Sequence, residues 1–411
     1  MGSASDADAD AVWITGLGLA TPLGFEFGHL ADNLMAGRSG IRPITHFDPV
    51  DQPCRIAACL PPIPAPEGWS PAEFAALGNR EKLLIFTAVN ALRDSGHWEQ
   101  RSSLRIGMVV GIGCEWIATW EADMHKGGRR VYEPARDSRD LTTFTREMIG
   151  ISGPSATVAA ACASGNVALA QARRWVERGF VDVCLAGACE IGTTPMGMAG
   201  FGNLGALSKR NDAPAAASRP FDRGRDGFVM GEGGAFFVLE SATRARKRGA
   251  RVYGEVAGVG ATSDAYHLVI PSSDSAPCVK AMRAALADAG LNPEDLDYVN
   301  AHATSTPVGD IFEVKALREV LGDHVMNVPV SATKSMTGHL LSAASAVEAL
   351  ACLAAFERNA IPPTINLDDP DPECDLCHVP HEARPHNVRT ALSNSFGFGG
   401  SNICVVFRRV A

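Results

Sequence analysis

The stretch Gly153-Pro-Ser-Ala-Thr-Val-Ala-Ala-Ala-Cys-Ala-Ser-Gly-Asn166 carries the strongest local signal in the chain. Its apolar residues predict a strand that runs directly into Cys162, and the residues after Cys162 predict the start of a helix. A cysteine at such a turn lies at the positive end of the helix dipole, which lowers the pKa of its thiol and favours the nucleophilic thiolate. The small residues Ala163, Ser164 and Gly165 leave room for a substrate and expose backbone N–H groups to an oxyanion. A buried structural cysteine is the alternative, and this stretch alone does not decide between the two.

The rest of the chain alternates short β-branched runs with Ala-rich helical runs, which predicts an α/β fold. Several expected strands are apolar on both faces, as strands are when helices cover both sides of a sheet. Helices are expected over Ser275–Ala289, with Ser275 as the N-cap, and over Ile311–Leu321. The expected strands are Val12–Gly16, Arg105–Val110, Val181–Gly187, Ala235–Leu239, Val252–Val259, Leu296–Asn300, Val328–Ala332, Thr390–Ser393 and Ile403–Phe407.

A similar pattern occurs twice and indicates an internal duplication. A strand, a turn of small residues and an Ala/Ser-rich helix follow one another at Val158–Val176 and again at Val328–Phe356. We therefore expect two similar halves, 11–253 and 254–411, and we treat residues 1–10 as a flexible lead outside the fold.

Composition excludes several classes of protein. Of the 411 residues, 46% are hydrophobic and 20% are charged, which excludes a disordered chain. The net charge of -9 argues against a nucleic-acid partner, so the basic segment Arg244–Arg251 is interpreted as a solvated helix end. No apolar run is long enough to span a membrane, and the first residues lack the features of a signal peptide. Eleven thinly spread cysteines fit reduced thiols, so we expect a cytoplasmic protein with no membrane partner.

Two histidines strengthen the functional interpretation of Cys162. His302 follows the expected strand Leu296–Asn300, and His339 lies in a turn rich in Ser, Thr and Gly. Strand ends of this kind are where site residues gather in α/β proteins. The two histidines are 37 residues apart and have no metal-ligand spacing, so no zinc site is expected. A further glycine-rich turn, Ser393–Asn402, offers backbone N–H groups near the end of the chain.

With these motifs in this order, the chain resembles the β-ketoacyl-acyl carrier protein synthases of the chain-elongating type. Those enzymes have a Cys-His-His site and act in type II fatty acid and polyketide synthesis. The resemblance runs from about Val12 to Phe407 and rests on the Cys162 turn, NAHATSTPVGD (300–310), KSMTGHL (334–340) and NSFGFGGSN (394–402). It implies a thiolase-like α/β fold in which two similar halves form five layers (αβαβα). It also implies a homodimer, with a heterodimer containing a related subunit as the alternative.

The resemblance assigns roles to five residues. Cys162 would take the acyl group from an acyl carrier protein thioester, and the backbone N–H groups of Cys162 and Phe398 would hold the oxyanion. His302 and His339 would donate hydrogen bonds to the malonyl thioester oxygen as CO2 leaves. Lys334 would orient the site electrostatically. The product would be a β-ketoacyl-acyl carrier protein, formed by a decarboxylative Claisen condensation.

The resemblance also indicates residues around this centre. Thr304 and Thr306 would bind the phosphopantetheine arm that carries the substrates, and Phe398 would gate the acyl pocket. Four further residues would line that pocket, of which Glu115 and Trp116 depart from a family stretch of small residues: Cys114, Glu115, Trp116 and Phe396. Carrier-protein docking is assigned to Arg210, Arg129 and Arg130. The resemblance also indicates a structural K+ or Na+, with buried ion-paired carboxylates as the alternative. Its candidate ligands are Asn300, Glu313, Glu348, Ser393 and Asn394. No other cofactor is expected.

Rival interpretations remain open at this level. A non-catalytic subunit that only shapes chain length in a heterodimer is the main alternative, but such subunits usually lack the nucleophile. Thiolases and ketosynthase III enzymes use Cys-His-Cys or Cys-His-Asn sites, against which His339 argues. The haem-attachment pattern Cys374–His378 needs an exported apoprotein, so haem is not expected.

Overall fold

The computed structural model describes residues 11–128, 140–272 and 274–410. Within these residues, ten strands form one mixed sheet in the order β10-β9-β13-β14-β8-β1-β7-β6-β4-β5. The strands of the first half are β1 (Val12–Ala20), β4 (Ile106–Gly111), β5 (Ser155–Val158), β6 (Val183–Glu190) and β7 (Gly233–Ser241). Those of the second half are β8 (Gly254–Ser263), β9 (Tyr298–Asn300), β10 (Val330–Ser331), β13 (Thr390–Gly397) and β14 (Ser401–Arg408).

Helices lie between these strands. The first half contains α2 (Phe27–Met35), α3 (Pro71–Ala75), α4 (Asn79–Asp94), α5 (Glu115–His125), α6 (Leu141–Met148), α7 (Ser164–Glu177), α8 (Pro195–Asn203) and α9 (Ala242–Lys247). The second half contains α10 (Ala276–Asp288), α11 (Gly309–Leu321), α12 (Lys334–Thr337) and α13 (Ala344–Arg358). Two short strand pairs, β2 (Arg42–Pro43) with β3 (Ile56–Ala57) and β11 (Ala360–Ile361) with β12 (Arg384–Pro385), lie outside the large sheet. Among the described residues, no helix combines the length and hydrophobicity needed to cross a membrane.

The two halves of the sheet repeat the same topology. Read outward from the middle, the order is β1-β7-β6-β4-β5 in one half and β8-β14-β13-β9-β10 in the other. In both halves the first two pairings are antiparallel and the last two are parallel. A short antiparallel contact between β1 and β8, from Trp13 to Glu255 and from Ile14 to Gly254, joins them. The duplication that the sequence indicates is therefore present, whereas its boundary at 253/254 stays a prediction.

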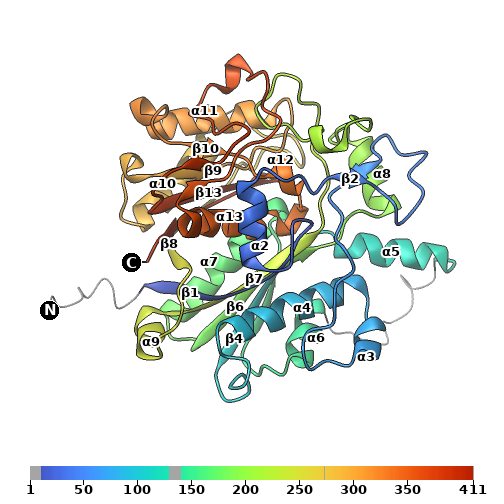
Figure 1. Cartoon of the computed structure of the whole chain (residues 1–411), viewed down its shortest axis with the longest axis vertical. Coiled ribbons are helices and arrows are strands. Elements are labelled where there is room, and N and C mark those ends of the chain that lie inside the picture. Colours follow the sequence, from blue (N-terminus) through green and yellow to red (C-terminus); the bar gives the residue numbers. More distant parts are fainter. Residues whose placement is uncertain (1–10, 129–139, 273, 411) are drawn as a thin grey trace.

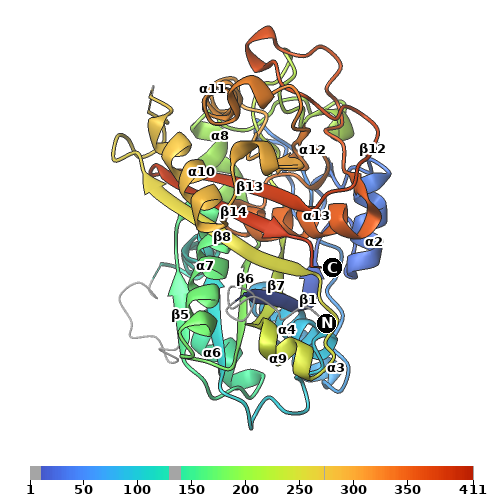
Figure 2. The same ribbon diagram turned by 90° about the vertical axis from the view of Figure 1, so that its left-hand side faces the viewer.

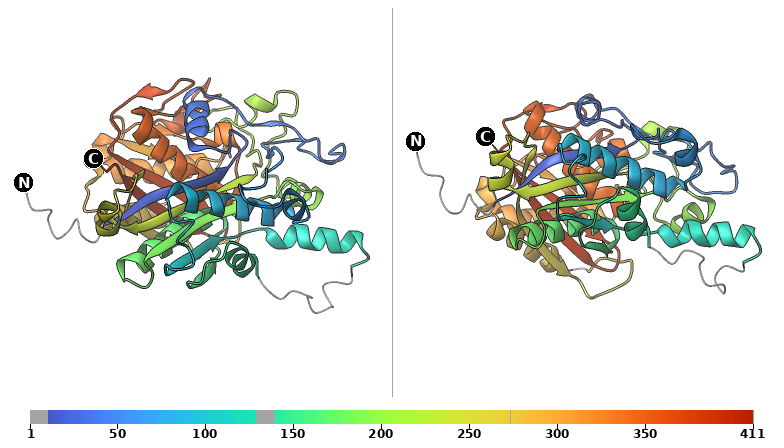
Figure 3. Two further views of the ribbon diagram at one scale, coloured as in Figure 1. Left: turned by 60° about the horizontal axis from the view of Figure 1, so that its bottom comes forward. Right: turned by 90° about the horizontal axis from the view of Figure 1, so that it is seen from below.

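The halves are stacked with two helices between them. Figures 1 and 2 show β8, β13 and β14 above β1, β6 and β7, with α7 and α13 in the middle. Helices α7 and α13 contact strands of both halves, while α10 covers the outer face of the second half and α4 that of the first. This is the expected five-layer arrangement. Figure 3 shows α5 extending away from the body of the first half.

Close packing of the two central helices depends on small residues. A Cβ added to Gly165 in α7 would lie 2.6 Å from the backbone nitrogen of Ala346 in α13, which is too close for any side chain. The Ser345 hydroxyl also accepts a hydrogen bond from the backbone nitrogen of Asn166 at 3.0 Å. The first turns of both helices are thus fixed against each other, and each turn leads to the candidate site.

Two local details differ from the sequence-based expectation. Ser275 makes no side-chain cap, because Asp274 accepts the hydrogen bond of the Ala276 backbone nitrogen at 2.9 Å. The strand before Cys162, β5, is half-exposed and ends at Val158, since it lies at the edge of the sheet.

The basic segment also does more than end a helix in solvent. Arg248 and Arg244 form ion pairs with the fully buried carboxylate of Glu240, and the Arg246 guanidinium lies 4.5 Å from the Trp13 ring centroid. The expected flexible lead, 1–10, lies outside the described residues.

Candidate active site

Cys162 lies in a tight turn that leads into α7. The turn is a 3-10 helix, Ala161–Ala163, and Ala161 has a positive φ of 47°, which a non-glycine residue rarely adopts. The Ser164 hydroxyl holds this turn by donating to the Ala161 carbonyl at 2.7 Å and accepting from the Ala160 backbone nitrogen at 2.9 Å. The thiol is buried, with 8% of Cys162 exposed. The sequence therefore places this cysteine correctly at a strand-to-helix turn.

The expected low pKa of this thiol is wrong. Burial raises the pKa of Cys162 to about 11, and the charge of Lys334 and the backbone N–H groups of Phe398 and Cys162 offset that effect only in part. The free energy needed to remove a thiolate from water is larger than the stabilisation that the helix dipole gives it. The resting nucleophile is a neutral thiol, and it needs a base.

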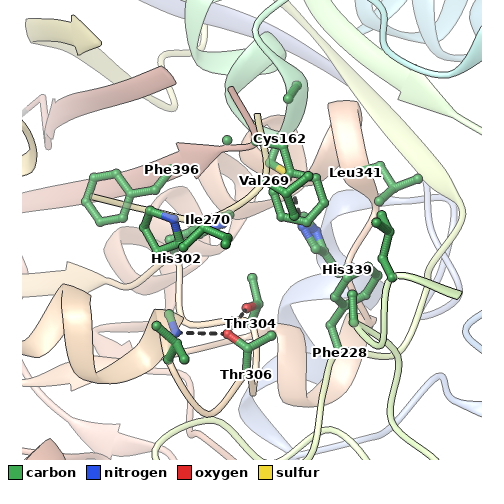
Figure 4. Close-up of a pocket in the computed structure, with 18 of the residues that line it drawn as sticks. Cys162, Phe228, Val269, Ile270, His302, Thr304, Thr306, His339, Leu341 and Phe396 are labelled. Carbon is green, nitrogen blue, oxygen red and sulfur yellow. Dashed lines mark hydrogen bonds between the residues drawn. The ribbon is translucent and has the colours of Figure 1, made fainter. Parts of the chain in front are cut away.

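His339 is positioned to act as that base. Its Nε2 atom lies 3.2 Å from the Cys162 sulfur, and its ring is 5.6 Å from that of His302 between centroids. One ligating atom from each of Cys162, His302 and His339 falls within 4.8 Å of the others, and Figure 4 shows the three side chains meeting in one pocket. Burial, with the nearby charge of Lys334, lowers the pKa of both histidines well below the usual range. Both imidazoles are therefore neutral at physiological pH.

Lys334 orients His302. Its buried ammonium donates to Nδ1 of His302 at 3.3 Å and forms an ion pair with Glu348. Because Nδ1 accepts this hydrogen bond, the ring hydrogen of neutral His302 lies on Nε2, which becomes a donor. The thiol and two imidazoles are close enough to ligate one metal ion, but the adjacent ammonium opposes a divalent cation at that place.

Glu313 fixes the turn that carries His302. Its carboxylate accepts from the backbone nitrogens of His302 at 2.9 Å and Ala303 at 2.7 Å, and from the Asn394 side chain at 3.0 Å. Burial raises the pKa of Glu313 to about 7 against these hydrogen bonds. This carboxyl positions His302 through its backbone and does not reach the thiol.

A group of buried oxygens near Glu313 fits an alkali cation. Six of the described residues have a buried side-chain oxygen without a hydrogen-bond partner, and four of the six are expected cation ligands: Asn300, Glu348, Ser393 and Asn394. Asn300 and Ser393 are direct neighbours across β9 and β13. Buried oxygens without a partner call for an explanation, and a hard cation prefers an all-oxygen donor set. The residues present therefore fit the expected K+ or Na+.

The glycine-rich turn between β13 and β14 packs directly on the Cys162 turn. A Cβ on Gly397 would lie 2.7 Å from the Ala160 carbonyl oxygen, so only glycine allows this approach. The backbone N–H groups of Phe398 and Cys162 both stabilise the charged sulfur, which places them where an oxyanion would form. The Phe398 side chain is 36% exposed at the rim of the pocket.

A mainly apolar cavity of about 440 Å³ opens onto the thiol. Thr304 and Thr306 line it with hydroxyls 3.2 Å apart (Figure 4), and Phe396 lies 5.9 Å from His302 between ring centroids. Cys114 lines the same cavity. The structure thus brings together the expected catalytic centre, both threonines, Phe396 and Cys114.

Of the remaining expected pocket and docking residues, the structure describes the side chain of Arg210 alone. Glu115 and Trp116 begin α5, but their side chains, like all of Arg129 and Arg130, lie outside the described residues. Arg210 is exposed, donates to the Gly224 carbonyl at 2.6 Å and does not line the cavity.

Sequence reasoning missed Arg225. This buried guanidinium donates to the backbone carbonyls of Thr306 at 3.0 Å and Pro307 at 2.9 Å, and it pairs with Asp371 at 2.7 Å. It therefore fixes the loop that carries the two threonines. Its only sequence signal is its place in the stretch SRPFDRGRDGFVMGEG (218–233), which resembles the family but gives no hint of this contact.

Comparison with known proteins identifies the family. A model described as "Beta-ketoacyl synthase, N-terminal domain" matches residues 9–245, and "Beta-ketoacyl synthase, C-terminal domain" matches residues 253–368. The chain belongs to the β-ketoacyl synthase family. Similar curated β-ketoacyl synthases include two named 3-oxoacyl-[acyl-carrier-protein] synthase 2. The protein from Synechocystis is 40% identical over 406 residues, 97% of this chain and 98% of the relative. The one from Coxiella burnetii is 40% identical over 414 residues, 97% of this chain and 98% of the relative.

Solved structures confirm the thiolase-like ketosynthase fold. A β-ketoacyl synthase from Burkholderia phymatum is 33% identical, with a TM-score of 0.88 over 98% of this chain and 100% of that one. A type II polyketide ketosynthase, solved with its acyl-carrier protein and bound to a hexaketide, is 29% identical. Its TM-score is 0.84 over 97% of this chain and 99% of that one.

Proposed function

We propose that this β-ketoacyl synthase condenses an acyl chain held on Cys162 with malonyl-acyl carrier protein, releasing CO2 and forming β-ketoacyl-acyl carrier protein. The observation that carries this function is the meeting of a thiol and two neutral imidazoles within 4.8 Å beside an apolar cavity. The higher identity to 3-oxoacyl-acyl carrier protein synthases than to the polyketide ketosynthase favours fatty acid elongation.

The first half-reaction transfers the acyl group to Cys162. His339 takes the thiol proton through Nε2, and the sulfur attacks the thioester carbonyl of the acyl carrier protein. The backbone N–H groups of Cys162 and Phe398 stabilise the oxyanion. As the tetrahedral intermediate collapses, the carbon–sulfur bond to pantetheine breaks and the proton passes from His339 to the leaving thiolate.

The second half-reaction forms the carbon–carbon bond. Malonyl thioester loses CO2, and the electron pair of the broken bond becomes an enolate. The enolate oxygen receives hydrogen bonds from His302 and from His339, whose ring hydrogen lies on Nε2 once Cys162 is acylated and no longer donates to that atom. The enolate carbon attacks the Cys162 thioester, and collapse of that intermediate expels the Cys162 thiolate. A proton from solvent then restores the thiol, which balances the reaction.

The rival function is a subunit that shapes chain length without catalysis. Such a role needs no nucleophile, no base and no oriented donor. This chain holds all three in contact, because Cys162 touches His339 and Lys334 touches His302. The complete set of reacting groups therefore disfavours the non-catalytic role.

The carrier protein is the proposed partner. The solved polyketide relative was captured with its acyl-carrier protein, which supports the same kind of complex here. Thr304 and Thr306 present hydroxyls along the cavity where a phosphopantetheine arm would enter, and Arg210 is the proposed docking cation. A homodimer and a cytoplasmic location complete the proposal.

A K+ or Na+ is the proposed structural ion. Asn300, Glu313, Glu348, Ser393 and Asn394 would hold it. A monovalent charge there would offset the two carboxyl groups, whose burial raises the pKa of each to about 7.

The function is tested by incubating the protein with acyl-carrier proteins bearing acyl chains and measuring intact mass. We expect a mass increase of one acyl group on the wild type and none on Cys162→Ala. Cys114→Ala is the matched control, since it removes a thiol from the same cavity and should still be acylated. Acylation of Cys162→Ala at another residue, or none on the wild type, would contradict the assignment.

A further inference from the structure

A second cluster of charged side chains lies behind the acyl cavity and takes no part in the chemistry. Arg80 in α4 forms an ion pair with Glu190 at the end of β6, with an Nη2–Oε1 distance of 3.0 Å. Glu190 is fully buried at 1% exposure, and Arg80 is largely covered at 15%. Neither residue contacts the thiol, the histidines or Lys334 through any hydrogen bond in the described part of the chain. A role other than catalysis must explain them.

The Arg80–Glu190 pair forms hydrogen bonds with two residues of the cavity wall, Cys114 and Ser342. Glu190 Oε2 accepts from the backbone nitrogen of Cys114 at 3.0 Å and from the Ser342 hydroxyl at 2.8 Å. Arg80 Nη2 donates to the Cys114 carbonyl at 2.8 Å. Cys114 is therefore held through both its N–H and its C=O. Cys114 and Ser342 both line the acyl cavity, one from each half of the molecule.

The cavity wall is tightly packed next to Cys114 and Ser342. A Cβ on Gly113 would lie 2.8 Å from the Cβ of Ser342 and 3.3 Å from the Glu190 carboxylate. Leu341, the residue before Ser342 in the cavity wall, has a strained positive φ of 51°. A strained conformation of this kind persists only when its surroundings hold it, and the hydrogen bond from Ser342 to Glu190 is part of that support.

Stability alone does not account for the pair. Replacing a buried ion pair by apolar residues of similar volume is often neutral or stabilising, because both charges lose their water. Here the Arg80 Nε atom has no partner among the described residues. Glu190, in contrast, accepts four hydrogen bonds, from Arg80, Ser342 and the backbone nitrogens of Cys114 and Ile191. The contacts converge on the cavity wall rather than on the ion pair itself.

We propose that the Arg80–Glu190 pair is a positioning device that fixes the inner wall of the acyl cavity at Cys114 and Ser342, and so sets the length of acyl chain that the enzyme accepts. The proposal rests on the condensing function proposed above. Because α5 begins at Glu115, the same pair fixes the point where that helix leaves the wall. A substitution that weakens the ion pair lengthens the acyl cavity and favours longer acyl chains.

The test compares Glu190→Gln with the wild type over a panel of saturated acyl-carrier proteins of increasing length. A glutamine has one acceptor oxygen, so it cannot accept from Arg80 on one side and from Cys114 and Ser342 on the other, and one side of the contact is lost. We expect kcat/KM for the longest chains to rise about tenfold relative to the shortest. Decarboxylation of malonyl-acyl carrier protein by the acyl-free variant should stay at the wild-type rate, since it needs only the histidines.

Two further variants keep the result decisive. Ser342→Ala removes one hydrogen bond and little volume, so it should fold and shift the dependence of kcat/KM on acyl length in the same direction. If Glu190→Gln does not fold, the result for Ser342→Ala tests the proposal by itself. Glu240→Gln is the matched control, because it breaks a buried carboxylate–arginine pair that does not touch the cavity. It should lower stability and leave the length profile unchanged. Wild-type profiles in all folded variants would overturn the proposal. Failure of the wild type to load any chain on Cys162 would instead overturn the condensing function.

Discussion

His302 and His339 are both neutral and buried, yet their partners differ. His339 touches the Cys162 sulfur, whereas His302 is held on its far side by Lys334. His339 can therefore act in both half-reactions, whereas His302 can act only in decarboxylation. Two residues of the same type thus acquire separable roles from their neighbours.

Alanine variants should separate these roles. We expect His302→Ala and His339→Ala each to lower malonyl decarboxylation about 10²-fold or more, the usual cost of one lost oxyanion donor. His302→Ala should still be acylated on Cys162 at close to the wild-type rate. His339→Ala should also be acylated more slowly, because the thiol loses its base. Stopped-flow CO2 release and time-resolved intact mass measure the two steps. Equal acylation rates in both variants would contradict the role of His339 as base.

Which site residues the sequence predicts depends on whether they stand in a short motif. Cys162 and His302 each follow a strand and precede small residues, and His339 lies in a turn rich in Ser, Thr and Gly, so local patterns mark all three. Arg80 and Glu190 meet only in the folded chain, 110 residues apart, and no periodicity connects them. The thiol pKa was predicted in the wrong direction because a motif shows the helix end but not the depth of burial.

At the scale of elements, the crossing of α7 and α13 holds the nucleophile in place. The sequence predicts both helices and their small residues, because an Ala/Ser-rich run after a strand is a local signal. It does not predict that β5 is a half-exposed edge strand, since strand order is decided by pairings between distant segments.

The variant Gly165→Ala tests the crossing. Its new Cβ would clash with the Ala346 backbone at 2.6 Å, so we expect a loss of about 1–3 kcal/mol in the free energy of unfolding and slower acylation of Cys162. Gly200→Ala in α8 is the matched control, because its Cβ would meet nothing within 4 Å. That variant should gain about 0.5–1 kcal/mol from helix propensity. Urea unfolding measures both, and equal stability of the two variants would contradict tight packing at the crossing.

Glu240 links β7 to α9 and gives the stability a dependence on pH. Burial raises its pKa, but hydrogen bonds from His97, Arg248 and Thr15 prevail and lower the pKa from 4.5 to about 2. A carboxyl whose pKa is lower in the folded state stabilises the fold above the unfolded pKa, and this stabilisation is lost as pH falls toward 2. The ionised group should contribute about 3 kcal/mol at pH 7.

Glu240→Gln removes that dependence. The difference in unfolding free energy between wild type and variant should shrink by about 2 kcal/mol from pH 7 to pH 3. Glu319→Gln, in the exposed pair with Arg283, is the control and should differ from wild type by less than about 1 kcal/mol at either pH. A difference for Glu240→Gln that stays constant with pH would show that the carboxylate is not selectively stabilised in the folded state.

At the scale of the whole molecule, the duplicated fold places the nucleophile on one half and both histidines on the other. Cys162 follows β5 of the first half, and His302 follows β9 of the second. The reaction centre therefore exists only where the halves meet, and the cavity opens from that seam to the surface. The proposed carrier protein would deliver its pantetheine arm there, although the net charge of this chain is -9. If that partner is acidic, cations near the opening would attract it against the net charge of the chain.

Arg210 is the cation to test. It is exposed four residues after Ala206, which lines the cavity, and its pairing with Asp226 is loose at 4.0 Å. We expect Arg210→Glu to raise KM for acyl-carrier proteins about tenfold at low salt, with the difference shrinking as salt rises. Small thioester substrates should react as with the wild type, because they do not need docking. Arg178→Glu makes the same charge change at the far end of α7, opposite Cys162, and should leave both KM values unchanged. An equal loss with both substrates, or an equal effect of the two variants, would show that Arg210 does not dock the carrier protein.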